Sequence, residues 1–328
     1  DARPWAGQRP FEMDYTGSLA KVCAMYAAFA LRDAVNRFLS AGSLPSGITS
    51  GADPQAAVFA AVSKAFDDTI ATAVPLLGKL PRKFLVPTYG RIFTLMGDEP
   101  SLYVDFAPDF RDDMEQMVIH SITNAAGRTI QALGYGWING ALQAAGFFRP
   151  GTKPNGLWLA GDYLYANSPP DGYTAWPTVT IRSENDGLTK QNTTCIDLAR
   201  LLVLIRDGRL VDEDTYRGNT DMADIMRQGA HAMQIFLTDG AASITERWNV
   251  TSGPLPFEVV HNKIGIGDLK PDVHGNVNFV HSELSHIVVA GSGRDFVVAW
   301  QNQPDTLAAH ERIRRIVTDT ITKFLEPS

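Results

Sequence analysis

The sequence predicts an α+β fold, in which a mainly helical lobe is followed by an antiparallel sheet and a C-terminal helix that covers the sheet. Before about residue 255, several segments repeat apolar residues at helical spacing. After that point the chain changes to short β-rich runs, "FEVVHNK", "HIVVAG" and "DFVVAW", separated by turn residues. The last segment, 307–326, again places its apolar residues on one helical face.

The size and composition are those of a globular protein with a substantial core. The chain has 328 residues, of which 45% are hydrophobic and 20% are charged. This length fits two packed lobes or one large unit. We expect a single unit over 1–328, with 18–255 forming the helical lobe and 256–328 forming the sheet and the C-terminal helix.

The charge balance argues against a nucleic-acid partner. Lys and Arg number 29 against 36 Asp and Glu, which gives a net charge of −7, and no basic cluster occurs. The longest apolar stretches, such as "LARLLVLI", are too short to cross a bilayer, so no integral membrane segment is expected. The absence of a leader fits either a cytoplasmic protein or a mature chain whose leader has been removed.

Apolar spacing and end signals place the helices before residue 255. Gly127 fits the end of the helix predicted over 108–126, and Gly146 fits the end of the helix over 136–146. Thr194 fits the start of the helix over 193–208, and Gly208 fits its end. A long irregular stretch rich in Pro, Gly and aromatic residues precedes Thr194, and such loops are often functional. The predicted helices cover 15–38, 54–77, 108–126, 136–146 and 193–208, and the irregular stretch covers 147–192.

The cysteines and histidines indicate no metal site. Cys23 and Cys195 lack metal spacing and fit either a disulfide or two buried thiols, and their helical surroundings favour thiols. His281 and His286 lie five apart without a third ligand, so a zinc site is not expected. No cofactor is expected either.

A serine and a lysine stand three residues apart where the first apolar helix begins. At this separation Ser18 and Lys21 are neighbours on a helix surface. If burial keeps the lysine amine neutral, the pair can act as a nucleophile and its base. The alternative is an ordinary helix N-terminus with a solvated lysine.

Two further strings follow in order along the chain. Ser121 and Asn124 lie in "MVIHSITNAAGRTIQALG", and Lys263 and Gly265 lie in "HNKIGIG", on a predicted strand that opens the sheet. Together with S-x-x-K at Ser18, these strings resemble the S-x-x-K, S-D-N and K-T-G motifs of class A β-lactamases and penicillin-binding proteins. The resemblance extends over most of residues 11–326.

The chain departs from this family in four places. Ser121 and Asn124 are separated by two residues where the family has one, and Ile264 stands where the family has Thr or Ser. The family's deacylating glutamate has no clear counterpart in the 147–192 loop, where Glu184 is a weak candidate. Only 17 residues precede Ser18, too few for the helix and strand pair that the family adds to its sheet.

The resemblance implies an acyl-transfer mechanism. Ser18 would attack a carbonyl while Lys21 takes its proton, and burial and a nearby Lys263 would lower the pKa of Lys21. The backbone N–H groups of Ser18 and Ile266 would form the oxyanion hole. Gly265 would let the strand approach the substrate.

The remaining motif residues would handle the leaving group and the substrate. The resemblance implies that Ser121 relays a proton to the leaving atom and that Asn124 holds a substrate amide. Lys263 would supply positive charge and polarise Ser121.

The resemblance therefore predicts a serine hydrolase that acts on an amide or ester through a covalent acyl-enzyme, in a periplasmic or extracellular setting. The substrate is expected to be a small molecule or a peptide-like molecule, such as a β-lactam, a D-Ala-D-Ala peptide or an ester. The altered motifs predict a poor β-lactamase. An impaired relative that binds a peptide or glycan in the same cleft, and a structural helical protein with coincidental motifs, are the alternatives. The oligomeric state is left open.

Overall fold

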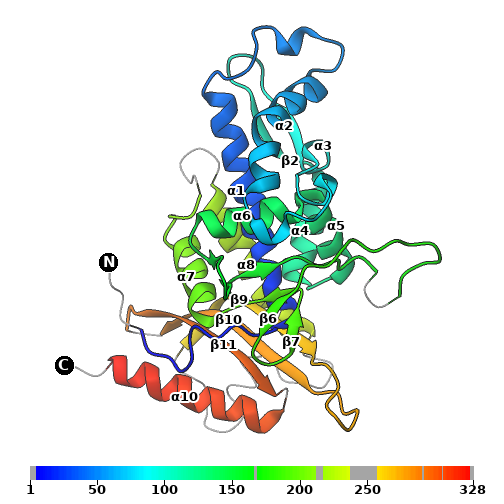
Figure 1. Cartoon of the computed structure of the whole chain (residues 1–328). Coiled ribbons are helices and arrows are strands. Elements are labelled where there is room, and N and C mark those ends of the chain that lie inside the picture. The colour runs from blue at the N-terminus through cyan, green and yellow to red at the C-terminus, as the bar shows by residue number, and fades with distance from the viewer. Residues whose placement is uncertain are drawn as a thin grey trace.

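A computed structural model describes residues 5–165, 168–211, 217–236, 257–289, 292–304 and 306–325. Most helices gather on one side of a three-stranded sheet, and α10 lies across the other side (Figure 1). The helices are α1 (Lys21–Ser40), α2 (Pro54–Thr72), α3 (Tyr89–Ile92), α4 (Pro108–Ile119), α5 (Thr123–Leu133), α6 (Tyr135–Ala144), α7 (Cys195–Arg206), α8 (Gly218–Phe236) and α10 (Leu307–Leu325), with 3₁₀ turns η1 (Gly17–Ala20), η2 (Ile48–Ser50), η3 (Pro75–Leu77) and η4 (Arg82–Phe84).

The sheet is antiparallel, with strand order β11-β10-β9. Its strands are β9 (Phe257–Asp268), β10 (Phe279–Val289) and β11 (Asp295–Pro304). The α+β prediction is confirmed, and so are the three β-rich runs and the final helix. The boundary expected near residue 255 lies outside the described residues.

Short two-stranded ladders make up the rest of the β structure. They pair β1 (Phe93–Met96) with β2 (Tyr103–Phe106), β3 (Phe148–Arg149) with β4 (Asn155–Gly156), β5 (Trp158–Leu159) with β8 (Gln191–Asn192), and β6 (Ile181–Ser183) with β7 (Gly187–Thr189). The last three ladders fall inside the stretch predicted to be an irregular loop over 147–192. They fold it back toward the start of α1.

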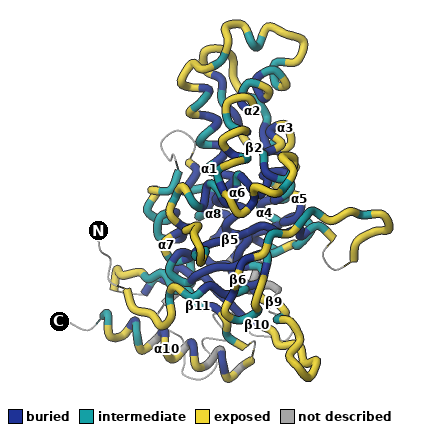
Figure 2. Tube along the Cα trace, viewed as in Figure 1, coloured by how far each residue is buried: buried dark blue, intermediate teal, exposed yellow. Residues whose placement is uncertain are grey.

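Helix α1 lies at the centre of the main core. It is buried along most of its length, because its sequence is apolar on nearly every side, and it packs against α5, α6 and β2 (Figure 2). A second, smaller core forms between the sheet and α10, where Ile264 and Ile287 meet Ile313, Val317 and Ile321. The predicted apolar face of the last helix is therefore the face that covers the sheet.

The prediction of one continuous helix over 108–126 is wrong. Helix α4 ends at Ile119 and α5 begins at Thr123. Between them Ser121 has φ +59°, a left-handed conformation that cannot continue an α-helix. Gly127 is inside α5 rather than at a helix end, and a Cβ there would lie 2.4 Å from the backbone nitrogen of Leu164. This glycine serves close packing of the loop against the helix.

Helix α7 forms as its end signals predict. Thr194 is the N-cap, and its hydroxyl accepts a hydrogen bond from the Asp197 N–H. Gly208, with φ +66°, follows the helix end. Both cysteines are free thiols, and burial raises the pKa of each to about 12.

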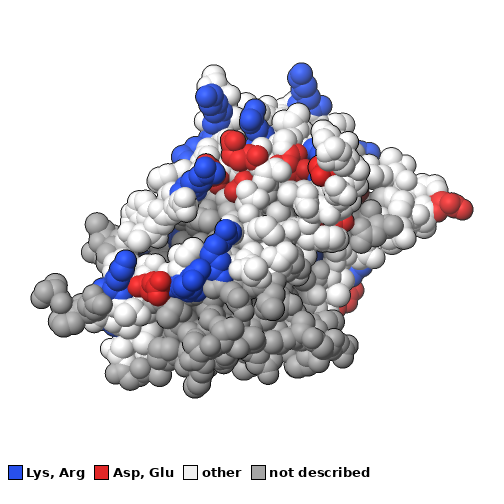
Figure 3. All heavy atoms as spheres, turned by 90° about the horizontal axis from the view of Figure 1, so that it is seen from below, with Lys and Arg blue, Asp and Glu red and all other residues white. Residues whose placement is uncertain are grey.

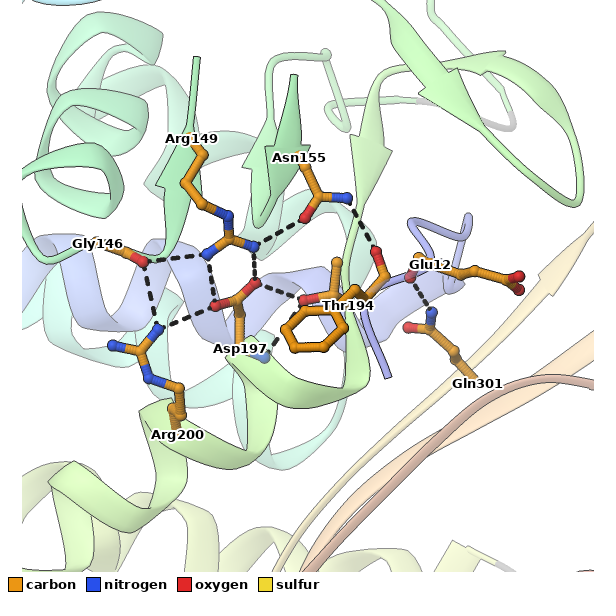
Figure 4. Close-up of polar contacts among 9 residues, drawn as sticks. Glu12, Gly146, Arg149, Asn155, Thr194, Asp197, Arg200 and Gln301 are labelled. Atoms are coloured by element: carbon orange, nitrogen blue, oxygen red, sulfur yellow. Dashed lines mark hydrogen bonds and ion pairs between the residues drawn. The ribbon is translucent and has the colours of Figure 1, made fainter. Parts of the chain in front are cut away.

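The base of the 147–192 loop is closed by a buried carboxylate (Figure 4). Asp197, whose side chain is 1% exposed, accepts two hydrogen bonds from Arg149, at 3.0 and 2.6 Å, and a further one from Arg200 at 3.2 Å. The Thr194 hydroxyl donates to the same carboxylate at 2.6 Å. The contact joins β3 to α7, so it holds the two ends of the loop together.

Replacing Asp197 with alanine should lower the free energy of unfolding by about 3 kcal/mol, because it removes a buried anion that two arginines and a hydroxyl share. A matched control is Asp224→Ala, which breaks the exposed Arg227–Asp224 pair of α8 and should cost less than about 0.5 kcal/mol. Urea denaturation of both variants measures the difference. Equal losses would mean that the Asp197 contact does not close the loop.

No described helix is long and apolar enough to cross a membrane. On the face of the molecule seen in Figure 3, Lys and Arg side chains are interspersed with Asp and Glu.

Candidate active site

The predicted nucleophile lies at the start of the central helix. Ser18 is half-buried in the 3₁₀ turn η1, and Lys21 is the first residue of α1. Lys21 has no exposed surface. The interpretation of a solvated lysine is therefore wrong, and the amine lies in the kind of environment that general-base chemistry needs.

The three motifs meet at the Ser121 hydroxyl. Lys21 Nζ donates to the Ser121 carbonyl at 2.6 Å and approaches its Oγ at 3.4 Å. Lys263 Nζ donates to the same Oγ at 2.9 Å. The left-handed backbone at Ser121 turns both its carbonyl and its hydroxyl toward Lys21. Residues separated by 100 and 142 positions in sequence thus form one cluster.

Burial shifts both amines toward their neutral forms. It lowers the pKa of Lys21 to about 8. Burial, and then the charge of Lys21, lower the pKa of Lys263 well below its ordinary value. Two cations this close together repel, so protonation of one amine opposes protonation of the other.

A neutral amine at Lys21 has two N–H groups and one lone pair. Both N–H groups have acceptors on Ser121, so the lone pair is left to accept a proton. Among the described residues no hydrogen bond joins the Ser18 hydroxyl to Lys21. Catalytic hydrogen bonds are often long before a substrate is bound.

The edge of the sheet lies directly against the nucleophile turn. A Cβ on Gly265 would lie 2.0 Å from the Thr16 carbonyl oxygen and 2.5 Å from the Leu19 nitrogen. A Cβ on Gly17 would lie 2.4 Å from the Ile266 carbonyl oxygen. The turn and the strand can touch only because both positions are glycine, and this contact brings the backbone of Ser18 next to that of Ile266.

The side chains of β9 alternate between the two faces of the sheet. Lys263 belongs to the face toward the helices, whereas Ile264 is 5% exposed and packs in the second core beneath α10. Ile266 is 41% exposed. The residue in the family's hydroxyl position is therefore a core residue of this protein.

The second motif needs no insertion. Thr123 stands two positions after Ser121, where the family spacing places asparagine, and it begins α5. Asn124, the residue predicted to bind substrate, instead accepts a hydrogen bond from the Tyr165 N–H at 2.9 Å. Its role toward a substrate stays a prediction.

Glu184, the weak candidate for deacylation, is exposed at the turn between β6 and β7. Its N–H donates to the Met13 carbonyl at 2.8 Å, so its backbone belongs to the contact between this hairpin and the segment before Ser18. A role in deacylation stays a prediction.

The carboxylate that organises the long loop is Asp162, which the sequence did not single out. It is buried and accepts hydrogen bonds from the Leu164 and Trp176 N–H groups, at 2.8 and 2.7 Å, and from the Tyr173 hydroxyl at 2.6 Å. The Gln131 amide adds a bond at 3.3 Å. Four donors share its two oxygens, which indicates a structural role.

In the part of the chain that the structure describes, no group of three His, Cys, Asp or Glu residues is placed to hold a metal ion. His286 instead contacts His261 and Asp295, at 2.8 Å each.

No family model matches the chain, and no curated protein matches it. Solved structures do match it. The chromosome-encoded β-lactamase of Vibrio parahaemolyticus is 12% identical, with a TM-score of 0.44, over 98% of this chain and 88% of that one. The β-lactamase of Sphaerobacter thermophilus is 11% identical, with a TM-score of 0.42, over 95% of this chain and 83% of that one. An ancestral class A β-lactamase is 16% identical, with a TM-score of 0.43, over 95% and 88%. In fold, the chain is similar to these β-lactamases over most of its length.

Proposed function

We propose that this protein is a serine acyl-transfer hydrolase that cleaves an amide or an ester through a covalent acyl-enzyme on Ser18. The observation that carries the proposal is the convergence of two buried lysines, Lys21 and Lys263, on the hydroxyl of Ser121 beside the helix turn that contains Ser18. At an ordinary helix end the lysine amines would stay in water, because burying two amines together raises the free-energy cost of protonating each of them.

In the proposed acylation step, Ser18 Oγ forms a bond to the substrate carbonyl carbon while its proton passes to Lys21 Nζ. The carbonyl oxygen becomes an oxyanion, which the N–H groups of Ser18 and Ile266 stabilise. The contact of Gly17 and Gly265 with their opposite backbones supports this pairing of donors.

The intermediate then collapses, and the bond to the leaving nitrogen or oxygen breaks. Ser121 donates a proton to the leaving atom and takes one from Lys21. Its hydroxyl oxygen already accepts from Lys21 and Lys263, so its own O–H remains for the leaving atom. Water finally attacks the acyl carbon, which releases the acid and restores Ser18.

The substrate class stays broad. A β-lactam, a peptidoglycan-like peptide and a simple ester all present a carbonyl to the same nucleophile, with Asn124 proposed to hold a substrate amide. Ile264 supplies no hydroxyl for a substrate carboxylate, so we infer weak β-lactamase activity. From the family resemblance we infer a periplasmic or extracellular location.

A second candidate function is binding without turnover. Thr123 and Ile264 both differ from the family's motifs. A relative that keeps the cleft but has lost efficient chemistry would bind a peptide or glycan there.

A fluorophosphonate probe separates the two candidates, because it reacts with an activated serine. The wild-type protein should gain one probe mass, and Ser18→Ala should gain none. Peptide mapping should place the adduct on Ser18. An unlabelled wild-type protein that is shown to be folded would contradict the hydrolase and favour the binding protein.

The rate of labelling should depend on pH through Lys21. Only the neutral amine accepts the serine proton, so the rate should rise about tenfold per pH unit below the pKa of about 8 and level off above it. Stopped labelling reactions between pH 6 and 10 measure the profile. A flat profile across this range would remove Lys21 from the role of base.

A further inference from the structure

Gln191 contacts the residue that precedes the nucleophile. It lies on β8, is 3% exposed, and its Nε2 donates to the carbonyl oxygen of Gly17 at 2.6 Å. Its Oε1 is buried and has no hydrogen-bond partner among the described residues. Burying an amide oxygen without a partner costs free energy, so this arrangement calls for an explanation.

The orientation of the Gln191 amide follows from its partner. The Gly17 carbonyl can only accept, so the NH₂ group must face it. The reverse orientation would place two acceptor oxygens against each other.

The Gly17 carbonyl and the Ser18 N–H belong to the same peptide unit. A trans peptide is planar, and its C=O and N–H point in opposite directions. A hydrogen bond that fixes the direction of the Gly17 oxygen therefore also fixes the direction of the Ser18 N–H. That N–H is one of the two donors proposed for the oxyanion hole.

Gly17 makes this peptide unit easy to rotate. Its φ is +57°, and a glycine reaches both signs of φ at little cost. Any other residue at position 17 would restrict the backbone through its side chain. The Ile266 carbonyl lies too close to Gly17 to leave room for a side chain there. The glycine that permits contact with β9 thus leaves the direction of this peptide to the short turn η1 and to the Gln191 side chain.

We propose that Gln191 is a positioning residue that aims the Ser18 N–H at the developing oxyanion, an inference that rests on the proposed function. It acts through the Gly17 peptide and does not touch the substrate. Preorganised donors stabilise a transition state because they need not reorient during the reaction. Loss of the Gln191 donor lets the Gly17–Ser18 peptide sample other orientations.

The neighbouring contacts hold the segment in place without Gln191. Asp14 and Thr193 exchange two backbone hydrogen bonds of 3.0 Å, and the Asn185 side chain makes two with the Tyr15 backbone, at 2.8 and 2.9 Å. A change at Gln191 should therefore affect the Gly17–Ser18 peptide and leave the fold in place.

The test compares Gln191→Met with Asn36→Leu. Both changes replace a buried amide by an apolar side chain of similar shape. Asn36 makes two hydrogen bonds to the Val104 backbone, far along α1 from Ser18. Gln191→Met should slow fluorophosphonate labelling by about 10- to 100-fold, somewhat less than deletion of an oxyanion-hole donor costs. Asn36→Leu should label at the wild-type rate even where it is the less stable variant.

Two further readouts separate positioning from general damage. Phenylboronic acid forms a tetrahedral adduct with an active serine, so its affinity for Gln191→Met should fall by a similar factor. The pH midpoint of labelling should not move, because within the described part of the chain Gln191 bonds Gly17 whereas Lys21 bonds Ser121.

Gln191→Glu gives a second variant if the methionine variant does not fold. A neutral carboxylic acid can donate to the Gly17 carbonyl, whereas an ionised one repels it. The labelling rate of Gln191→Glu relative to wild type should therefore fall as the pH rises.

Two results would overturn this inference and leave the proposed function standing. In the first, Gln191→Met is labelled as fast as the wild-type protein. In the second, Asn36→Leu loses as much labelling rate as Gln191→Met. A wild-type protein that is never labelled would overturn the proposed function and the inference together.

Discussion

Replacing Ser18 with alanine is expected to reduce hydrolysis of an activated ester such as p-nitrophenyl acetate by about 10⁴-fold or more. The substitution deletes only the Oγ that would form the acyl bond. The side chain is half-buried in η1, so the melting temperature should stay close to that of the wild-type protein. Ester hydrolysis and circular dichroism on the same samples measure both effects.

Lys21→Met should lose nearly as much activity as Ser18→Ala, because a nucleophile and its base act as a unit. Methionine fills most of the volume of a lysine and does not leave a buried charge. Ser63→Ala is the matched control for Ser18→Ala, because it also removes one serine hydroxyl, which bonds Asp67 within α2. It should hydrolyse the ester at the wild-type rate. If Ser18→Ala kept the wild-type rate, Ser18 would not be the nucleophile.

The second large effect is expected in the hydrolysis of the acyl-enzyme. Glu184 is exposed, and the oxygens of Asp162 are shared among four donors, so neither carboxylate is both buried and free to act as a base. A water without a placed base lacks a rate gain of about 10²- to 10⁴-fold. The penicilloyl adduct on Ser18 should therefore persist for minutes or longer.

Formation of this adduct should also be slow. Ile264 cannot donate a hydrogen bond to the penicillin carboxylate, which weakens binding by about 1 kcal/mol. Intact-mass spectrometry after a pulse of penicillin measures both formation and decay, with Ser18→Ala as the sample that forms no adduct. Rapid and complete turnover of penicillin without an adduct would mean that Glu184 or another group activates the water.

Local signals in the sequence were sufficient for much of the fold. Helix α7 starts and ends where Thr194 and Gly208 indicate, because a cap and a left-handed glycine act on the residues next to them. The strands β9, β10 and β11 follow their β-rich runs for the same reason. The spacing of Ser18 and Lys21 is likewise a local property, since the turn η1 runs directly into α1 and holds the two residues three positions apart.

The errors of prediction lie where a distant segment outweighs the local pattern. The apolar spacing over 108–126 continues through Ser121, but the chain breaks there and turns the serine toward Lys21 and Lys263. Gly127 looked like a helix end and is instead a site of contact with Leu164. Asp162 carried no signal at all, because its donors come from Gln131 and from its own loop only after that loop has folded.

By itself, then, the sequence determined the α+β class, helix α7, the three strands of the sheet, the final helix and the candidate nucleophile with its base. Only the tertiary structure decided that Lys21 and Lys263 are buried on one hydroxyl, that Gly17 and Gly265 bring η1 against β9, and that Gln191 contacts the peptide before Ser18. The physical reason is that spacing along a chain sets which neighbours a residue has on its own element. Burial, and the pKa shifts that follow from it, depend on segments more than a hundred residues away.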